Sequence, residues 1–112
     1  MIAENKIQAA SFQWHWNTYP AERMRLFMNY NNPPSKIAGG QLKAQGMLAG
    51  VGDMTYLMPS GRVAFIEFKT ELGKQRPEQV KFQQVCDGLN TPYFICRSLD
   101  EFQKIILSLQ NV

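Results

Sequence analysis

Two carboxylates and a lysine stand out because their types and spacing could support hydrolytic chemistry. Glu67 follows Asp53 by fourteen residues, and Lys69 lies two residues beyond Glu67. Residues two apart in a strand point to the same face, so Glu67 and Lys69 would share one face. If the intervening segment folds as a hairpin about Ser60-Gly61, paired positions sum to about 121, and Asp53 lies opposite the end of the second strand. The hairpin therefore brings two carboxylates and an ammonium group to one end of a sheet.

The chemistry available to this trio is metal-assisted hydrolysis. Two close carboxylates repel each other unless a cation lies between them, and carboxylate oxygens suit Mg²⁺ or Mn²⁺. Such a metal lowers the pKa of a bound water and stabilises charge on a phosphoryl oxygen, while a lysine orients the water or neutralises developing charge. The spacing is equally compatible with a structural arrangement, in which Asp53 caps a turn and Glu67 and Lys69 form an exposed ion pair.

The elements that must position the trio follow from apolar periodicity and turn residues. The segment over 62–69 is apolar on both faces through most of its length, which predicts a central strand covered on both sides. The order of elements predicts a small α/β fold with a mixed sheet. We expect a helix over 3–17, a strand or short helix within 18–34, a helix over 36–46 that ends at Gly46, strands over 53–58 and 62–69, a helix from Pro77, a strand over 93–97 and a helix from Ser98.

Composition excludes several classes of protein but says little about function. The 112 residues, 45% of them hydrophobic, suit a single domain over 1–112 with its own core. No apolar run approaches about 20 residues, which excludes a membrane-spanning segment, and Glu4 interrupts the N-terminus where a signal peptide would be apolar. Cys86 and Cys96 are too few for a disulfide scaffold, so we expect reduced thiols and an intracellular protein. The net charge of +3 says little about partners.

Several stretches carry a family resemblance in the right order along almost the whole chain. They are Glu4 to Gln8, Gln45-Gly46, Gly50-Val51-Gly52-Asp53, Ile66-Glu67-Phe68-Lys69-Thr70, Gly73-Lys74, Pro77-Glu78-Gln79, Gly88 to Arg97 and Ser98 to Glu101. Together they resemble the PD-(D/E)XK nuclease core and, more narrowly, the virus-type replication-repair nuclease (VRR-NUC) domain. Gly52 stands where that family usually has proline, and we expect this difference to alter backbone stiffness rather than chemistry.

The resemblance implies a restriction-endonuclease-like mixed sheet core of the α-β-β-β-α type, flanked by helices. It implies Asp53, Glu67 and the backbone carbonyl of Phe68 as ligands of Mg²⁺, for which Mn²⁺ would substitute, and Lys69 as the catalytic lysine. Glu4 would be a first-helix carboxylate that approaches the metal or its waters. Its other interpretation is an acid favourable in the first turn of a helix.

Gln79 is the remaining residue that the resemblance places at the site. It would lie near the trio and help to position the lysine or the phosphate. The alternative for Gln79 is a solvated position on its helix.

The implied function is a metal-dependent DNA endonuclease that selects branched DNA such as a four-way (Holliday) junction. We expect a homodimer, because a domain this small covers little duplex, and a place in the cytoplasm of a bacterial cell or a phage-infected host. Two alternatives remain open. One is a non-catalytic DNA-binding or assembly module on the same fold, and the other is an unrelated α/β interaction protein with a surface ion-pair cluster.

Other residues with functional potential have ordinary interpretations as well. His15 is the one histidine. Such a residue is more often a packing or surface residue than a catalytic one. Trp14 and Trp16 point to different helix faces, so we expect at least one in the core or an interface. Several basic residues flank the trio and would either grip phosphates or simply solubilise the protein. They are Lys36, Lys43, Arg62, Lys74, Arg76 and Lys81.

Overall fold

One mixed sheet forms the centre of the computed structural model, which describes residues 2–30 and 32–111. The strands lie in the order β1-β2-β3-β4, with antiparallel pairing from β1 to β3 and parallel pairing between β3 and β4. Met54 pairs with Ile66, close to the expected register, which leaves Asp53 opposite Glu67 at the end of the hairpin. The α/β prediction with a mixed sheet is therefore confirmed. The strands are β1 (Leu26–Met28), β2 (Met54–Leu57), β3 (Val63–Phe68) and β4 (Tyr93–Cys96).

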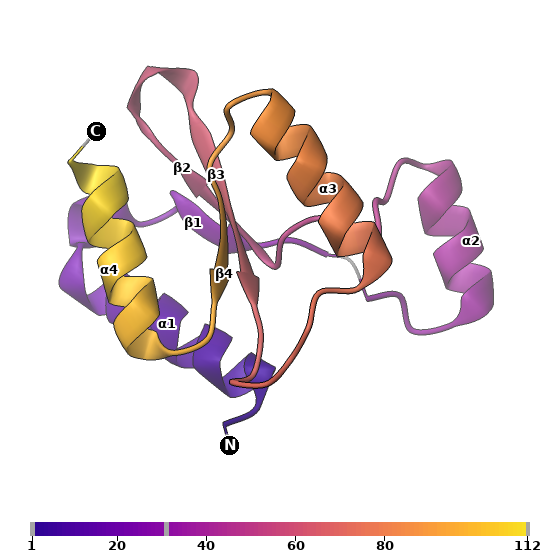
Figure 1. Cartoon of the computed structure of the whole chain (residues 1–112), viewed down its shortest axis with the longest axis horizontal. Coiled ribbons are helices and arrows are strands. Elements are labelled where there is room, and N and C mark those ends of the chain that lie inside the picture. Colours follow the sequence, from indigo (N-terminus) through magenta and orange to yellow (C-terminus); the bar gives the residue numbers. More distant parts are fainter. Residues whose placement is uncertain (1, 31, 112) are drawn as a thin grey trace.

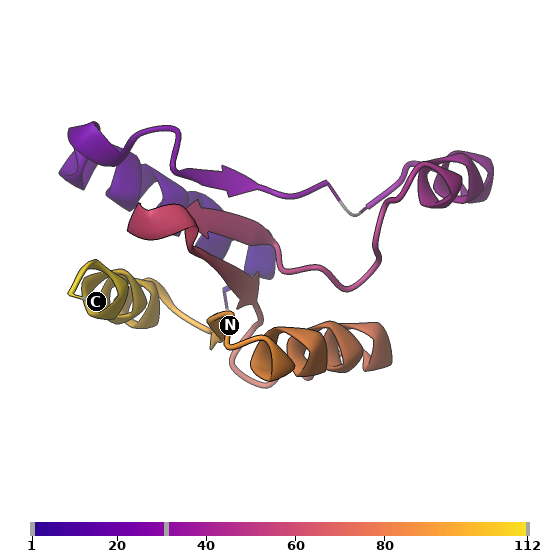
Figure 2. The ribbon, with the colours of Figure 1, turned by 90° about the horizontal axis from the view of Figure 1, so that it is seen from above.

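Helices cover both faces of this sheet (Figures 1 and 2). α1 and α4 pack against each other on one face, α3 lies on the opposite face, and α2 stands away from the layers. The segment within 18–34 holds a 3₁₀ turn, η1, followed by the short strand β1, so its strand interpretation is confirmed in part. The helical elements are α1 (Glu4–Thr18), η1 (Pro20–Glu22), α2 (Lys36–Ala44), η2 (Pro59–Gly61), α3 (Pro77–Gly88) and α4 (Leu99–Gln110).

The core explains why β3 is apolar on both faces. Ile66 and Phe68 are almost completely buried on the side of α1 and α4, where the ring of Phe68 stacks on Phe102. On the other face Phe65 packs against Phe82 of α3, with 5.0 Å between ring centroids. β3 is thus a central strand covered on both sides, as its sequence predicts.

Local capping fixes the two helices that follow the sheet. Pro77 occupies the first turn of α3, where its missing N–H costs no hydrogen bond. At the start of α4, the Oγ of Ser98 accepts from the N–H of Glu101 at 3.1 Å. In a capping box, the Glu101 carboxylate would accept from the N–H of the N-cap residue Ser98. Here it accepts from the N–H of Arg97, one residue earlier.

The described residues include neither a helix suited to cross a membrane nor a disulfide bond. No helix within residues 2–30 and 32–111 combines the length and apolar character needed to cross a bilayer. Cys86 and Cys96 are both buried as free thiols. Cys86 lies in α3 and Cys96 in β4.

Candidate active site

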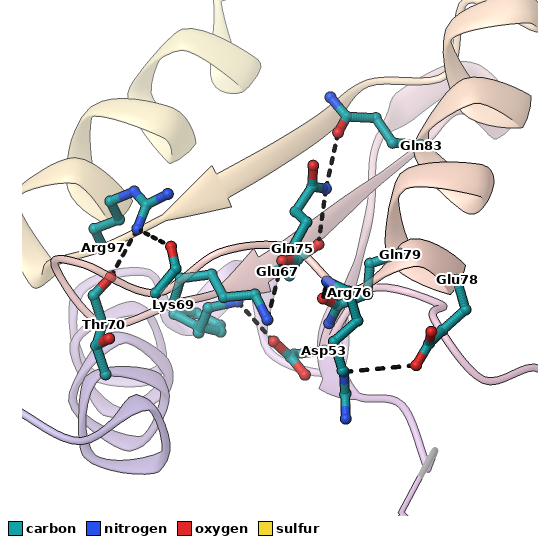
Figure 3. Close-up of polar contacts among 12 residues, drawn as sticks. Asp53, Glu67, Lys69, Thr70, Gln75, Arg76, Glu78, Gln79, Gln83 and Arg97 are labelled. Atoms are coloured by element: carbon teal, nitrogen blue, oxygen red, sulfur yellow. Dashed lines mark hydrogen bonds and ion pairs between the residues drawn. The ribbon is translucent and has the colours of Figure 1, made fainter.

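The predicted trio meets at one end of the β2–β3 hairpin (Figure 3). Asp53 immediately precedes β2, and Lys69 immediately follows β3. The Lys69 Nζ lies 3.6 Å from Oε2 of Glu67, and Oδ2 of Asp53 accepts a hydrogen bond of 2.6 Å from the N–H of Phe68. The hairpin geometry expected from the spacing is therefore present.

Burial distinguishes this trio from an ordinary surface ion pair. Glu67 is 1% exposed and Lys69 is 5% exposed, so the alternative of an exposed ion pair is wrong. Burial raises the pKa of the Asp53 carboxyl, and the charges of Glu67 and Glu4 raise it further, against the Phe68 N–H and Lys69, which lower it. The ionised form of Asp53 is therefore disfavoured by its surroundings, even with the lysine in place.

The two oxygens of Glu67 have different surroundings. Oε1 accepts a hydrogen bond from the Tyr93 hydroxyl. It accepts another from Nε2 of Gln75, which also donates to Gln83 (Figure 3). Oε2 is buried and accepts no hydrogen bond, with the Lys69 ammonium 3.6 Å away. One oxygen is thus fixed by the protein, and the other is left with unused acceptor capacity.

Tyr93 is suited to hold the carboxylate because its hydroxyl keeps its proton. Burial raises the pKa of Tyr93, and the hydrogen bond to Glu67 and the charges of Glu67 and Asp53 raise it further. The hydroxyl therefore stays a donor through the neutral range, and Glu67 stays the acceptor.

Comparison with solved structures identifies the fold that carries this site. A "VRR_NUC domain protein" superposes with a TM-score of 0.72 at 14% identity, over 98% of this chain and 89% of that chain. This chain has the VRR-NUC fold. A second structure, a "VRR_NUC domain", superposes with a TM-score of 0.61 at 18% identity, over 92% of each chain. No protein-family model matches the sequence, and no curated protein matches it. The similarity is one of shape far more than of sequence.

The donor set that the VRR-NUC fold assembles here fits a small divalent metal. Mg²⁺ typically keeps several waters and takes only one or two carboxylates from a protein. Asp53 and Glu67 supply two carboxylates, and the buried Oε2 of Glu67 accepts no hydrogen bond from the described residues. Among the described residues, no three His, Cys, Asp or Glu side chains gather to share one ion. The two carboxylates therefore fit a cation that takes the rest of its ligands from elsewhere, as Mg²⁺ does with water.

Glu4 is close enough to influence this site but does not join the carboxylate pair. It lies in the exposed first turn of α1, and its charge helps to raise the pKa of Asp53 after the larger effect of burial. Glu4 thus influences the site through its charge. Its role toward a metal or its waters stays a prediction.

Gln79 and Phe68 have structural roles that the sequence does not reveal. Gln79 is 4% exposed, and its Oε1 accepts from the N–H of Arg76 to cap α3, so the solvated-helix interpretation is wrong. The backbone of Phe68 lies beside Asp53 through its N–H. Its carbonyl as a metal ligand, and Gln79 as a catalytic residue, stay predictions.

Asn29 is a supporting residue that sequence reasoning misses. Its N–H donates to the Asp53 carbonyl at 2.8 Å, and its Nδ2 donates to the Gly52 carbonyl at 2.7 Å. The Oδ1 of Asn29 accepts from the Thr55 hydroxyl. Asn29 therefore fixes the backbone of Asp53 from β1, and only strand pairing reveals this, because the two residues are far apart in sequence.

The loop that follows β3 is held by hydrogen bonds to its backbone in a comparable way. Nη1 of Arg97 donates to the carbonyls of Thr70 and Gly73, each at 2.7 Å (Figure 3). Arg97 lies just after β4, which pairs with the end of β3. It thereby anchors the chain immediately beyond Lys69.

Gly52, where the VRR-NUC resemblance would place proline, allows a close approach. A Cβ at this position would lie 3.1 Å from the Cβ of Phe65 and 3.3 Å from the backbone of Ile66. A glycine therefore lets the strand that carries Asp53 start close against β3.

The aromatic and histidine candidates of α1 belong to packing rather than to the site. His15 is buried and hydrogen-bonds to Glu22, near the end of α1 opposite Glu4. Trp14 packs edge-on against Phe102 of the core, whereas Trp16 is 40% exposed. The expectation that at least one tryptophan joins the core is confirmed.

Proposed function

We propose that this chain is a metal-dependent endonuclease that hydrolyses phosphodiester bonds in DNA. The observation that carries the proposal is the buried Oε2 of Glu67, which accepts no hydrogen bond beside the Lys69 ammonium. A buried carboxylate oxygen that accepts no hydrogen bond is costly in a folded protein, and a bound cation would offset that cost. The VRR-NUC fold supports the same assignment.

In this mechanism Asp53, Glu67 and the Phe68 carbonyl hold Mg²⁺, for which Mn²⁺ substitutes. When bound, the ion supplies Lewis-acid polarisation of the phosphate and lowers the pKa of the attacking water. The Lys69 Nζ donates a hydrogen bond to the water or to a phosphate oxygen, and its charge stabilises the negative charge that develops there. Tyr93 and Gln75 keep Glu67 in place during the reaction.

We propose branched DNA, such as a four-way junction, as the substrate and a homodimer as the active form. The longest extent of the chain is 40 Å, which equals about 12 base pairs at about 3.4 Å per pair. One copy therefore spans about one duplex arm, whereas two copies related by a twofold axis place two sites on one junction. The proposed setting is the cytoplasm of a bacterial cell or a phage-infected host.

Cleavage assays on a panel of labelled substrates test this function. Four-way junction, nicked, flapped, single-stranded and plain duplex DNA are each incubated with Mg²⁺, Mn²⁺ or EDTA. We expect metal-dependent cutting that is fastest on the junction. Lys69→Ala and Asp53→Ala should each lower the rate by at least about 10²-fold, because Lys69 would stabilise the charge that develops at the phosphate and Asp53 would hold the metal ion.

Lys104→Ala is the matched control, since Lys104 is an exposed lysine on α4. Its cleavage rate should equal that of the wild type. Undiminished cutting by both site variants would contradict the mechanism. Tight binding of the junction with no cutting under any metal would instead favour the alternative, a DNA-binding or assembly module without catalysis.

A further inference from the structure

The segment between β1 and β2 forms an arm that projects from the body of the molecule. We define the arm as residues 32–50, which comprise α2 and the two connections to it. Figures 1 and 2 both show α2 away from the sheet and from the other helices. Most of its residues are exposed, including Lys36, Ile37 and Lys43. Such a helix gains little from packing within its own chain.

The charge of the arm is one-sided. No Asp or Glu occurs between Glu22 and Asp53, although the chain has nine acidic residues in total. The arm itself carries Lys36 and Lys43. Its positive charge is therefore not balanced locally, unlike Arg76, which pairs with Glu78 at 3.6 Å.

The two lysines share one face of α2. They are seven residues apart, which is close to two helical turns and about 10 Å along the axis. Gly39 and Gly40 lie between them, and the face is a shallow hollow of about 550 Å³. Its lining consists of Pro33, Ser35, Lys36, Gly39, Gly40 and Lys43. The ring of Pro33 covers Gly39, but nothing lies within 4 Å of a Cβ at Gly40, which leaves open space between the lysines for a sugar–phosphate backbone. The repeat of that backbone, about 3.4 Å per pair, spaces the lysines by about three pairs.

Both ends of the arm are held close to Asp53. On one side Asn29 binds the backbone of Gly52 and Asp53. On the other side Gly50 is packed against the first turn of α3, where a Cβ would lie 2.5 Å from the Glu78 carbonyl oxygen. A hollow of about 260 Å³ runs from the site to the base of the arm, lined by Gln8, Met28, Asn29, Tyr30, Asn32 and Asp53.

We infer that the lysine face of the arm binds the phosphate backbone of duplex DNA next to the bond that is cut. This inference rests on the proposed nuclease function and adds the surface that would hold the substrate. Charge complementarity, and the hollow that runs from Asp53 to Asn32 at the base of the arm, favour nucleic acid as the occupant. A second copy of the chain is the competing occupant, because Ile37 is 78% exposed on the same helix.

The test compares two double variants with the same loss of charge. Lys36→Ala/Lys43→Ala removes the lysine face, whereas Arg62→Ala/Lys104→Ala removes two exposed basic groups, one at the far end of the hairpin and one on α4. Fluorescence anisotropy measures binding to a labelled duplex and to a four-way junction with the same arms. EDTA prevents cutting, and the salt is varied between about 50 and 200 mM.

We expect the arm variant to bind about tenfold more weakly at low salt, with the slope of log affinity against log salt reduced by about 2. The control variant should keep at least most of the wild-type affinity and slope. Circular dichroism and thermal unfolding should be unchanged in both variants, because the substituted side chains are exposed.

Three results would contradict the inference and leave the proposed function intact. They are an arm variant with wild-type affinity and slope, a control variant weakened as much as the arm variant, and an arm variant that sediments as a monomer where the wild type is a dimer. The last result would assign the arm to contact between copies. If the wild type neither binds nor cuts DNA, the proposed function itself fails.

Discussion

At the scale of single residues, the decisive feature is the unequal environment of the two Glu67 oxygens. Tyr93 and Gln75 hold Oε1, while Oε2 is buried without a hydrogen bond near Lys69. A carboxylate held at one oxygen is pre-organised to offer the other to a ligand, because its rotamer no longer has to be fixed on binding. Burial and neighbouring carboxylates raise the pKa of Asp53, and a bound cation would favour its ionised form.

Tyr93→Phe tests this pre-organisation. The variant keeps the aromatic ring that packs on Phe82 but removes the hydroxyl that donates to Glu67. We expect cleavage to need about 10- to 100-fold more Mg²⁺ for half-maximal rate. Residues that hydrogen-bond to a metal ligand change metal affinity on this scale. The measurement is the cleavage rate as a function of Mg²⁺ concentration.

Tyr19→Phe provides the matched loss of a hydroxyl, from a tyrosine whose ring packs edge-on against Trp14. Its Mg²⁺ dependence should follow the wild type. If Tyr93→Phe also follows the wild type, Tyr93 does not position Glu67.

At the scale of elements, the connection from α2 to β2 is the one on which the site depends most. It carries Asp53, and it passes the start of α3 at Gly50, where φ is +93° and there is no room for a Cβ. The same α3 turn buries Gln79. The position of the carboxylate is therefore coupled to the packing of this loop on α3.

Gly50→Ala should disturb that packing. The added methyl group meets the backbone of Glu78 and Gln79 in a conformation that side chains rarely adopt. We expect a loss of about 1–3 kcal/mol in the free energy of unfolding and a lower cleavage rate. Urea unfolding and the junction assay measure the two effects.

Gly40→Ala is the control, because nothing lies within 4 Å of a Cβ at that position in α2. Alanine is the better helix former there and should stabilise α2 by about 0.5–1 kcal/mol. Equal stability of the two variants would show that Gly50 is not confined by α3.

At the scale of the whole molecule, Glu22 ties together elements that are distant in sequence. Its carboxylate accepts from Tyr56 of β2 at 2.6 Å and from Gln110 of α4 at 3.1 Å, and it contacts His15 of α1 at 2.9 Å. Burial raises the pKa of Glu22, but the hydrogen bonds and the charge of Arg25 outweigh it, so the pKa lies below the usual 4.5. This cluster closes the end of the α1–α4 layer.

The lowered pKa of Glu22 predicts a contribution to stability that depends on pH. It is present above the unfolded pKa near 4.5 and is lost as the pH falls through the lower folded value. Glu22→Gln should be less stable at neutral pH by about 1–3 kcal/mol, because hydrogen bonds to a charged group are replaced by weaker ones. Its free energy of unfolding should also fall less than that of the wild type on acidification.

Urea unfolding at a series of pH values measures both effects, with Glu71→Gln as an exposed control. Parallel stability curves for the wild type and Glu22→Gln would contradict the prediction. A control variant that reproduces the flatter curve would contradict it as well.

Much of the fold could be predicted because its signals are local. Periodicity and turn residues placed α1, α2, β2, β3, α3, β4 and α4 close to their observed bounds. The segment before Pro33 was ambiguous, because β1 has only the residues Leu26–Met28 and is a strand through its pairing with β2. A strand that short has no periodicity of its own.

The sequence by itself determined that the trio meets at one end of a hairpin and in what approximate register, since Asp53, Glu67 and Lys69 flank one local turn. Only the tertiary structure decided that the trio is buried, that Tyr93 and Gln75 hold Glu67, and that Asn29 holds Asp53. Tyr93 and Asn29 reach the site from the two strands that flank the hairpin, and Gln75 reaches it from the loop before α3. These contacts depend on strand pairing and helix packing over long sequence separations, which no spacing of residues encodes.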